Sequence, residues 1–304
     1  MSQLYGKDPV NSQECYQRDI TYEISEDLRS GHTVVGTMFR ETEEIDKLGS
    51  ITYFEKAREN RFRIIVIDCE HKAFNQERIA AYAKIAHKMG LSLWLRPTQQ
   101  DEEAINKYAD MGVSGFMIPN VIKLPRVRKI INQAYFAPIA ETEANIRRGY
   151  SMGDVVLDGP PLTNIAEEMA YANRNMIVTL QTEHPKGIEN LSGVISLPGV
   201  FGTIIGPNDL AISLSQLPRN QSLIKQDLSK MYNDERMMNS YRKIGEIASA
   251  CGKVAGIHFT RIEECSLVED LVENMGYRLI LLGTEKNFYC SDFLRTKRRI
   301  ESIG

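Results

Sequence analysis

Short apolar runs alternate with longer amphipathic stretches along most of the chain. Eight runs read TVVGTM, IIVID, LSLWLR, GFMIP, MIVTLQ, GTIIG, KVAGIHF and YRLILLG, and they begin at Thr33, Ile64, Leu91, Gly115, Met176, Gly202, Lys253 and Tyr277. Short β-rich runs separated by helical stretches are typical of βα units with a parallel sheet. Eight such units predict a (β/α)8 TIM barrel rather than an open, doubly wound sheet.

The stretches between the runs have the spacing of helices. Asn75 is placed to cap the stretch QERIAAYAKIAHKM, in which Ile79, Tyr82 and Met89 fall on one face before Gly90 ends it. A helix end, Met-Gly and a strand then follow one another in HKMGLSLWLR, ADMGVSGFMI and ENMGYRLILL. This recurrence indicates that one supersecondary unit is reused, which favours the barrel.

The barrel is predicted over residues 31–304, and residues 1–30 are predicted to be an arm or helix that closes its bottom. Two gaps, 120–175 and 208–252, are longer than one helix requires. The first contains SMGDVVLDGPPLTN, whose Gly, Pro and Asp residues predict a long loop. Because the loops after barrel strands build the active site, we expect this loop to lie over that site.

Composition and charge exclude several classes of protein. The chain has 304 residues, 42% of them hydrophobic, and a formal charge of −3, so it can bury a large core and does not suggest a nucleic-acid or membrane partner. Its five cysteines lack paired or CxxC spacing, which indicates a reducing compartment. The first twenty residues lack the apolar core of a signal peptide, so a cytoplasmic protein is predicted.

Polar residues stand at the predicted ends of several strands, where barrel enzymes carry their chemistry. They are Asp68, Glu70 and His71 after IIVID, Arg96 at the end of LSLWLR, Gln181 and Glu183 in LQTE, and Asp209 in GPNDL. Two carboxylates with open positions suit a hard divalent ion such as Mg²⁺ or Mn²⁺, which chelates a 2-oxo acid. The pattern therefore predicts a metal site beside a base and an arginine.

This arrangement suggests a lyase or a proton-transfer enzyme. The metal would act as a Lewis acid on an enolate, while Arg96 adds fixed positive charge near the developing oxyanion. Histidine titrates near neutrality, so His71 can move a proton directly or through metal-bound water. Asp68 and Glu70 would orient His71 or that water by hydrogen bonds.

Each of these residues also has a structural interpretation. A lone carboxylate at a strand end is commonly a helix cap or an ion-pair partner, and Arg96 has carboxylates beside it to pair with. His32, His87 and His258 are interpreted as structural, because none belongs to a second ligand pattern. The joint placement of the other residues at strand ends is what favours a functional site.

Several motifs resemble one known family. IDCEH, LWLRP, INKYADMGVSGFMIPNV, LQTE and GTIIGPNDLAISLSQ occur in the order and at the intervals found in metal-dependent pyruvate aldolases of the HpcH/HpaI type. The resemblance covers about Gly31 to Gly283. It implies a (β/α)8 barrel assembled as a hexamer, a trimer of dimers, in which a C-terminal helix is exchanged between subunits.

The resemblance also implies a reaction and a set of site residues. The reaction is aldol cleavage or condensation of a 2-oxo acid and an aldehyde with Mg²⁺, Mn²⁺ or Co²⁺. The implied roles are His71 as base, Arg96 as transition-state stabiliser, Glu183 and Asp209 as metal ligands, Gln181 with the backbone at Asn208 and Asp209 as substrate contacts, and Asp110 as the aspartate that raises the basicity of the histidine. Asp110 precedes the fourth strand, so the barrel rule places it toward the opposite face unless a neighbouring subunit supplies it.

The chain departs from the family pattern in two places. Asn208 in GPNDL stands where the family has a small residue, which alters the expected carboxylate pocket. The segment APIAETEANIRRGY retains only Arg148-Gly149 of the family motif. The altered stretch, 136–163, is expected over the site, so the acceptor aldehyde or the reaction itself can differ.

Three alternatives remain open at this stage. A Schiff-base aldolase needs a lysine at a strand end, but Lys253 begins its strand and Lys72, Lys123 and Lys186 are in polar stretches. A CoA-ester or other C–C lyase on the same barrel would need a basic groove for the nucleotide. A non-catalytic 2-oxo-acid-binding homologue would retain the metal site without the reaction.

Overall fold

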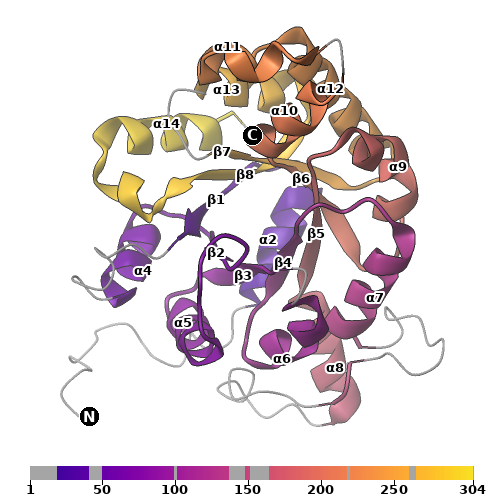
Figure 1. Ribbon diagram of the computed structural model, residues 1–304. Coiled ribbons are helices and arrows are strands. Elements are labelled where there is room, and N and C mark those ends of the chain that lie inside the picture. Colours follow the sequence, from indigo (N-terminus) through magenta and orange to yellow (C-terminus); the bar gives the residue numbers. More distant parts are fainter. Residues whose placement is uncertain are drawn as a thin grey trace.

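The computed structural model describes residues 19–40, 50–98, 101–136, 148–150, 164–217, 220–259 and 265–303. Eight parallel strands pair in chain order and close on themselves, with β1 beside β8 (Figure 1). The strands are β1 (Val34–Phe39), β2 (Ile64–Asp68), β3 (Ser92–Arg96), β4 (Gly115–Ile118), β5 (Ile177–Thr182), β6 (Val200–Ile205), β7 (Val254–Phe259) and β8 (Tyr277–Thr284). The predicted (β/α)8 barrel is confirmed.

Helices surround the barrel and connect its strands (Figure 1). They are α2 (Ile20–Arg29), α4 (Ser50–Glu59), α5 (Gln76–Lys88), α6 (Ile105–Asp110), α7 (Leu124–Ala134), α8 (Ile165–Arg174), α9 (Pro185–Ile195), α10 (Pro207–Ser215), α11 (Leu228–Tyr232), α12 (Glu235–Ala250), α13 (Cys265–Met275) and α14 (Ser291–Glu301), with short 3-10 turns η1 (Asp101–Ala104), η3 (Leu223–Lys225) and η4 (Glu285–Tyr289). As predicted, the Asn75 side chain caps α5 by accepting a hydrogen bond from Arg78 N at 2.8 Å.

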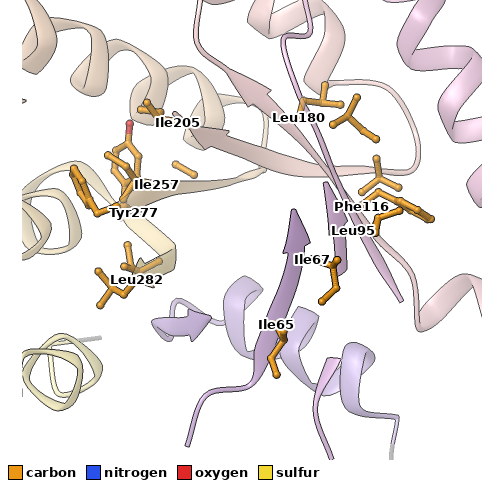
Figure 2. Close-up of a cluster of buried hydrophobic side chains, with 14 of the residues drawn as sticks. Ile65, Ile67, Leu95, Phe116, Leu180, Ile205, Ile257, Tyr277 and Leu282 are labelled. Carbon is orange, nitrogen blue, oxygen red and sulfur yellow. The ribbon is translucent and has the colours of Figure 1, made fainter. Parts of the chain in front are cut away.

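Alternation along the strands divides their side chains between two apolar layers. The outer layer packs between strands and helices, as Figure 2 shows for Ile65 and Ile67 of β2. Their neighbours Ile64 and Val66 instead belong to the layer that fills the barrel. Because successive side chains of a strand point to opposite faces, the next inward position of β2 is Asp68.

The bottom of the barrel is closed by α2, which lies across it in Figure 1. Its Ile20, Ile24 and Leu28 pack with the inward side chains of the strands in one buried cluster. Trp94 fills part of the interior, and a Cβ at Gly115 would lie 2.5 Å from its indole ring. The packed interior leaves the opposite end, where the strands finish, as the place for polar side chains.

The long gaps contain more than one helix each. Residues 208–252 hold all of α10 except its first residue, then η3, α11 and α12. Residues 137–147 and 151–163, which include most of the predicted loop over the site, lie outside the described residues. The C-terminal α14 packs on its own barrel through buried Phe293 and Ile300, so exchange of this helix between subunits stays a prediction.

Candidate active site at the mouth of the barrel

The polar side chains singled out in the sequence gather where the strands end. Asp68 follows the inward residues of β2, Arg96 follows Trp94 of β3, and Gln181 lies on the inward face of β5. The register pairs Asp68 directly with Arg96 across the β2–β3 ladder. Alternation and register therefore bring residues from separate strands into one layer above the apolar interior.

Asp68 and Arg96 form a buried ion pair at the centre of this layer. Their exposed fractions are 0% and 5%. Nη2 of Arg96 lies 2.8 Å from Asp68 Oδ1, and Nε donates to the same oxygen at 3.0 Å. Burial opposes ionisation of Asp68, but the charge and hydrogen bonds of Arg96 outweigh it and lower the pKa of Asp68. The pair holds the guanidinium in a fixed orientation.

Glu70 and His71 lie beside this pair, nearer to solvent. Glu70 Oε2 is 3.3 Å from Nε of Arg96 and 3.7 Å from Nε2 of His71. Burial raises the pKa of Glu70, and the charges of Arg96 and His71 offset part of that rise. The His71 side chain is 49% exposed, and its backbone N–H donates to Asp68 Oδ1 at 3.3 Å. Asp68 and Glu70 thus contact both Arg96 and the His71 turn; their role in orienting His71 stays a prediction.

Glu183 is buried next to Gln181. Its Oε2 accepts from Gln181 Nε2 at 2.5 Å, and its Oε1 accepts from the Asn120 backbone N–H at 2.8 Å. Burial and the negative charges of Asp209 and Glu70 raise the pKa of Glu183 to about 8. The groups around Glu183 therefore do not compensate the negative charge of its ionised form.

The turn from β6 into α10 supplies the second predicted carboxylate. Gly206 precedes the helix, Pro207 is its first residue, and Asp209 lies in its exposed first turn. Asn208 also lies in this turn, and its Oδ1 accepts from the Tyr232 hydroxyl at 2.5 Å. The first N–H groups of a helix have no partner within it, so this turn offers donors to an anion.

A cavity of about 220 Å³ opens among these groups. It is smaller than the roughly 300–1,000 Å³ usual for drug-sized ligands, so a small metabolite fits its size. Its lining comprises Met38, Arg40, His71, Arg96, Gln181, Gly206, Pro207, Asn208, Asp209 and His258. Five of the lining residues, His71, Arg96, Gln181, Asn208 and Asp209, were identified from the sequence.

Two lining residues with ionisable side chains were not identified from the sequence as part of the site. Arg40 follows β1, and its Nε is 3.3 Å from Asp68 Oδ2. His258 was interpreted as structural, but it lies on β7 with 8% exposure and lines the cavity. Burial and the charges of Arg96 and Arg40 lower the pKa of His258 to about 3. Inward alternation with Gly256 of β7 was the available signal for this histidine.

Asp110 does not join the cluster within this chain. It ends α6, before β4 begins, and pairs with Arg148 Nη2 at 2.7 Å. Arg148 Nη1 also donates to the Ala134 backbone oxygen at 3.1 Å. The barrel rule had predicted this placement away from the strand ends. A catalytic role for Asp110 stays a prediction that requires a neighbouring subunit.

The candidate metal ligands fit a divalent cation only in part. Among the residues that the structure describes, no three or more His, Cys, Asp or Glu side chains gather closely enough to hold a metal ion. Burial is the main cause of the raised pKa of Glu183, and the negative charge of Asp209 adds to it. Gln181 Oε1 is buried without a hydrogen-bond partner. Two carboxylates suit an ion that takes its other ligands from substrate and water.

Two further cavities open toward the other end of the barrel, of about 70 and 400 Å³. Their described lining residues include Arg148 in the first and Arg29, Arg174 and Lys253 in the second, but no carboxylate. They lack the combination of acids, base and arginine found at the strand ends. In the described chain, no helix is long and apolar enough to cross a bilayer.

Comparison with known proteins agrees with this geometry. The model of the family described as HpcH/HpaI aldolase/citrate lyase matches residues 50–262. A 2-keto-3-deoxy-L-rhamnonate aldolase of Salmonella paratyphi B is 24% identical over 195 residues, which are 63% of this chain and 66% of that protein. The match thus spans slightly less than two thirds of the relative's length.

Solved structures share the fold. An HpcH/HpaI aldolase from Desulfitobacterium hafniense DCB-2 has a TM-score of 0.70 at 24% identity, covering 92% of this chain and 96% of its own. An HpcH/HpaI aldolase/citrate lyase family protein from Burkholderia cenocepacia J2315 has a TM-score of 0.68 at 18% identity, covering 91% and 97%. The predicted class, a carbon–carbon lyase, agrees with the family description. This chain belongs to the HpcH/HpaI aldolase/citrate lyase family.

Proposed function

We propose that the protein is a metal-dependent lyase that cleaves a hydroxylated 2-oxo acid into a pyruvate-type 2-oxo acid and an aldehyde, and forms the same bond in reverse. One observation carries the proposal: Asp209, Arg96 and His71 line one small cavity, and Glu183 lies next to Gln181 of its lining, where the charge of Asp209 acts on it. A divalent ion held by the two carboxylates would supply Lewis-acid charge to the keto and carboxylate oxygens of the substrate.

The remaining groups match the needs of the reaction. In cleavage, a base removes the proton of the C4 hydroxyl, the C3–C4 bond breaks, and its electron pair moves toward the C2 oxygen. Arg96, held by Asp68 and Glu70, provides fixed positive charge near that oxygen. The N–H groups at the start of α10 and the Gln181 amide would bind the substrate carboxylate, because Gln181, Asn208 and Asp209 line the cavity.

His71 is the proposed proton carrier. It lines the cavity, yet half of its side chain is open to solvent. A base in this position can take the hydroxyl proton, exchange it with water and return one to C3. The carboxylate of Glu70, 3.7 Å from Nε2, stabilises the charged imidazolium.

A Schiff-base reaction would need a lysine in the cavity. None of the described residues that line it is a lysine. Lys253 lies at the start of β7 and donates to the Val200 backbone oxygen at 2.5 Å, while Lys72, Lys123 and Lys186 are exposed. The name of the Salmonella relative, an aldolase of a 2-keto-3-deoxy acid, supports the same class of substrate.

The assembly and location of the protein belong to the proposal. We propose a homo-oligomer, with the hexamer implied by family resemblance, in the cytoplasm. Light scattering on the purified chain would give six times its mass for a hexamer. A monomeric mass would remove the possibility that Asp110 reaches a neighbouring site.

The function is tested by exchange of the C3 protons of pyruvate into deuterated water, followed by NMR with and without Mg²⁺ or Mn²⁺. We expect metal-dependent exchange by the wild type and its loss in Glu183→Ala and Asp209→Ala. Titration calorimetry should show loss of divalent binding in both variants. Glu189→Ala, which removes an exposed carboxylate from α9, is the matched control.

The outcomes separate the alternatives. Metal binding without proton exchange would indicate a binding protein rather than an enzyme. A covalent adduct trapped by borohydride with pyruvate would overturn the metal mechanism in favour of a Schiff base. Unchanged metal affinity in both carboxylate variants would remove Glu183 and Asp209 from the site.

A further inference from the structure

We propose that Arg40 and His258 form a second anion-binding subsite, which holds a carboxylate on the part of the substrate that leaves as the aldehyde. The inference rests on the proposed function and narrows its substrate class to 2-oxo acids with a second carboxylate. None of the roles assigned above uses either residue. Both line the cavity: Arg40 directly follows β1, and His258 lies on β7.

The backbone of Arg40 is anchored by a hydrogen bond, but its guanidinium has no close carboxylate of its own in the described part of the chain. Its backbone N–H donates to Oε2 of buried Glu285 at 3.0 Å, which anchors the chain as it leaves β1. Among the described residues, its guanidinium pairs only with Asp68, at 3.3 Å from Oδ2. That contact does not have hydrogen-bond geometry: Arg40 Nε and Asp68 Oδ2 are both buried, and neither atom has a hydrogen-bond partner in the described structure.

Asp68 is already engaged by another arginine. Its Oδ1 accepts from Arg96 Nε at 3.0 Å and lies 2.8 Å from Arg96 Nη2. One carboxylate therefore faces two guanidinium groups, and Glu70 adds its charge on the Arg96 side, at 3.3 Å. The charge of Arg40 also acts on the carboxyl group of Glu285, and burial raises the pKa of that group, so it compensates the charge less than an exposed carboxylate would. Among the described residues, Arg40 therefore lacks a fully matched partner, which favours an anion beside it.

His258 adds an unpartnered donor or acceptor to the same side. It is more than nine-tenths buried, and its Nε2 has no hydrogen-bond partner in the described structure. Buried polar atoms are nearly always hydrogen-bonded, so an orphan atom at a cavity indicates a missing ligand or water. With its pKa near 3, the free imidazole is neutral and offers one N–H and one acceptor nitrogen.

The cavity is consequently divided by charge. On one side, burial and the charge of Asp209 raise the pKa of Glu183, the neighbour of Gln181. On the other side, burial and the charges of Arg96 and Arg40 lower the pKa of His258. A 2-oxo acid bound with its keto and carboxylate oxygens toward the first side places its far end toward the second. One guanidinium and one neutral imidazole match a singly charged carboxylate better than a phosphate, which brings up to two charges and three acceptor oxygens.

The test compares two acids that differ only in the second carboxylate, 2-oxopentanedioate and 2-oxopentanoate, by titration calorimetry with Mg²⁺. We expect the wild type to bind the dicarboxylate at least about tenfold more tightly, because the second carboxylate accepts charge-assisted hydrogen bonds at the subsite. Arg40→Gln should abolish the preference, and Arg40→Lys should retain most of it. His258→Leu should reduce the preference several-fold, whereas His258→Gln, which keeps a donor, should reduce it less.

Arg242→Gln, an exposed arginine of α12, is the matched control for loss of one positive charge, and its preference should equal that of the wild type. Circular dichroism establishes that each variant is folded. Equal binding of both acids by the wild type would overturn the subsite while leaving the proposed function intact. Binding of neither acid would overturn the proposed function and the subsite together. A preference that survives in Arg40→Gln would exclude Arg40 from the subsite.

As a second readout, condensation of pyruvate with glyoxylate should be favoured over condensation with its ethyl ester. The ratio of the two kcat/KM values should fall in Arg40→Gln at least about tenfold relative to Arg242→Gln. An unchanged ratio would show that the acceptor carboxylate does not reach Arg40.

Discussion

At the scale of single residues, the surroundings of a carboxyl group decide its charge. Asp68 and Glu183 both lie buried at strand ends of one barrel. Asp68 faces Arg96, and its pKa is lowered; Glu183 faces Asp209 and Glu70, and its pKa is raised to about 8. Asp68 therefore stays charged beside its arginine, whereas Glu183 would have to lose a proton before it could bind a cation.

This difference predicts that metal binding depends on pH. A cation binds the ionised form of Glu183, so affinity should rise up to about tenfold per pH unit until the pH reaches about 8, and then level off. Mn²⁺ titrations from pH 6 to 9 would measure this. In Glu183→Gln the affinity should be weak and nearly constant over the range. A constant wild-type affinity would contradict the assignment.

Replacement of His71 tests the proposed base. His71→Ala should slow C3 proton exchange of pyruvate by on the order of 10²- to 10⁴-fold, the usual effect of removing a general base. Metal and pyruvate binding should stay nearly unchanged, because the metal ligands are untouched. His32→Ala, an exposed histidine before β1, is the control. Exchange at the wild-type rate would make His71 a structural residue.

At the scale of elements, the site is built by the way strands end and helices begin. Inward residues of β2, β3 and β5 continue from apolar to polar as the barrel opens, and α10 begins immediately after β6. The link at Gly206 is tight: a Cβ there would lie 2.6 Å from Gln181 Nε2 and 2.7 Å from Glu183 Oε2. The backbone of one turn thus fixes the position of side chains from another strand.

Gly206→Ala should disturb the site without unfolding the barrel. The φ of Gly206, −97°, is open to any residue, so the effect would come from the clash with Gln181 and Glu183. Metal affinity should fall at least about tenfold as these side chains move. Gly193→Ala in α9, where a Cβ has no atom within 4 Å, is the matched control. Equal metal affinity in both variants would show that the site tolerates the added methyl group.

At the scale of the whole molecule, the closed sheet and its two apolar layers stabilise the fold. The buried ionisable groups where the strands end lower that stability. Burying Glu183 among like charges is unfavourable for its ionised form. The folded protein therefore holds a proton there that the unfolded chain releases near pH 4.5. The free energy of unfolding therefore depends on pH through the protonation of Glu183.

The sign of that effect can be measured. Because the folded pKa of Glu183 lies above the unfolded value, its contribution to stability is complete below about pH 4.5 and is lost as pH rises toward 8. The free energy of unfolding of the metal-free wild type should fall over this window relative to Glu183→Gln, by as much as a few kcal/mol. Urea denaturation at pH 5 and 8 measures the difference. Parallel pH profiles in the two proteins would contradict it.

Much of the architecture follows from local pattern. The eight apolar runs became the eight strands with ends shifted by at most two residues, as where β6 begins at Val200 rather than Gly202. The end of β2 in Asp68, followed by Glu70 and His71, was visible because an apolar run stops there. Residues 136–163 remain a prediction, since most of them lie outside the described residues.

The chain order of apolar runs, helices and strand-end polar groups is enough to determine the barrel and most of its mouth, because side-chain alternation and right-handed βα units act locally. Only closure of the sheet decides which strands become neighbours across the mouth. Pairing of β1 with β2, which sets Phe39 opposite Ile67, brings Arg40 to Asp68. Closure of β1 on β8, the neighbour of β7, brings the charge of Arg40 near His258, and packing outside the sheet pairs Asp110 with Arg148. Such contacts depend on distances between strands in space, which spacing along the chain does not specify.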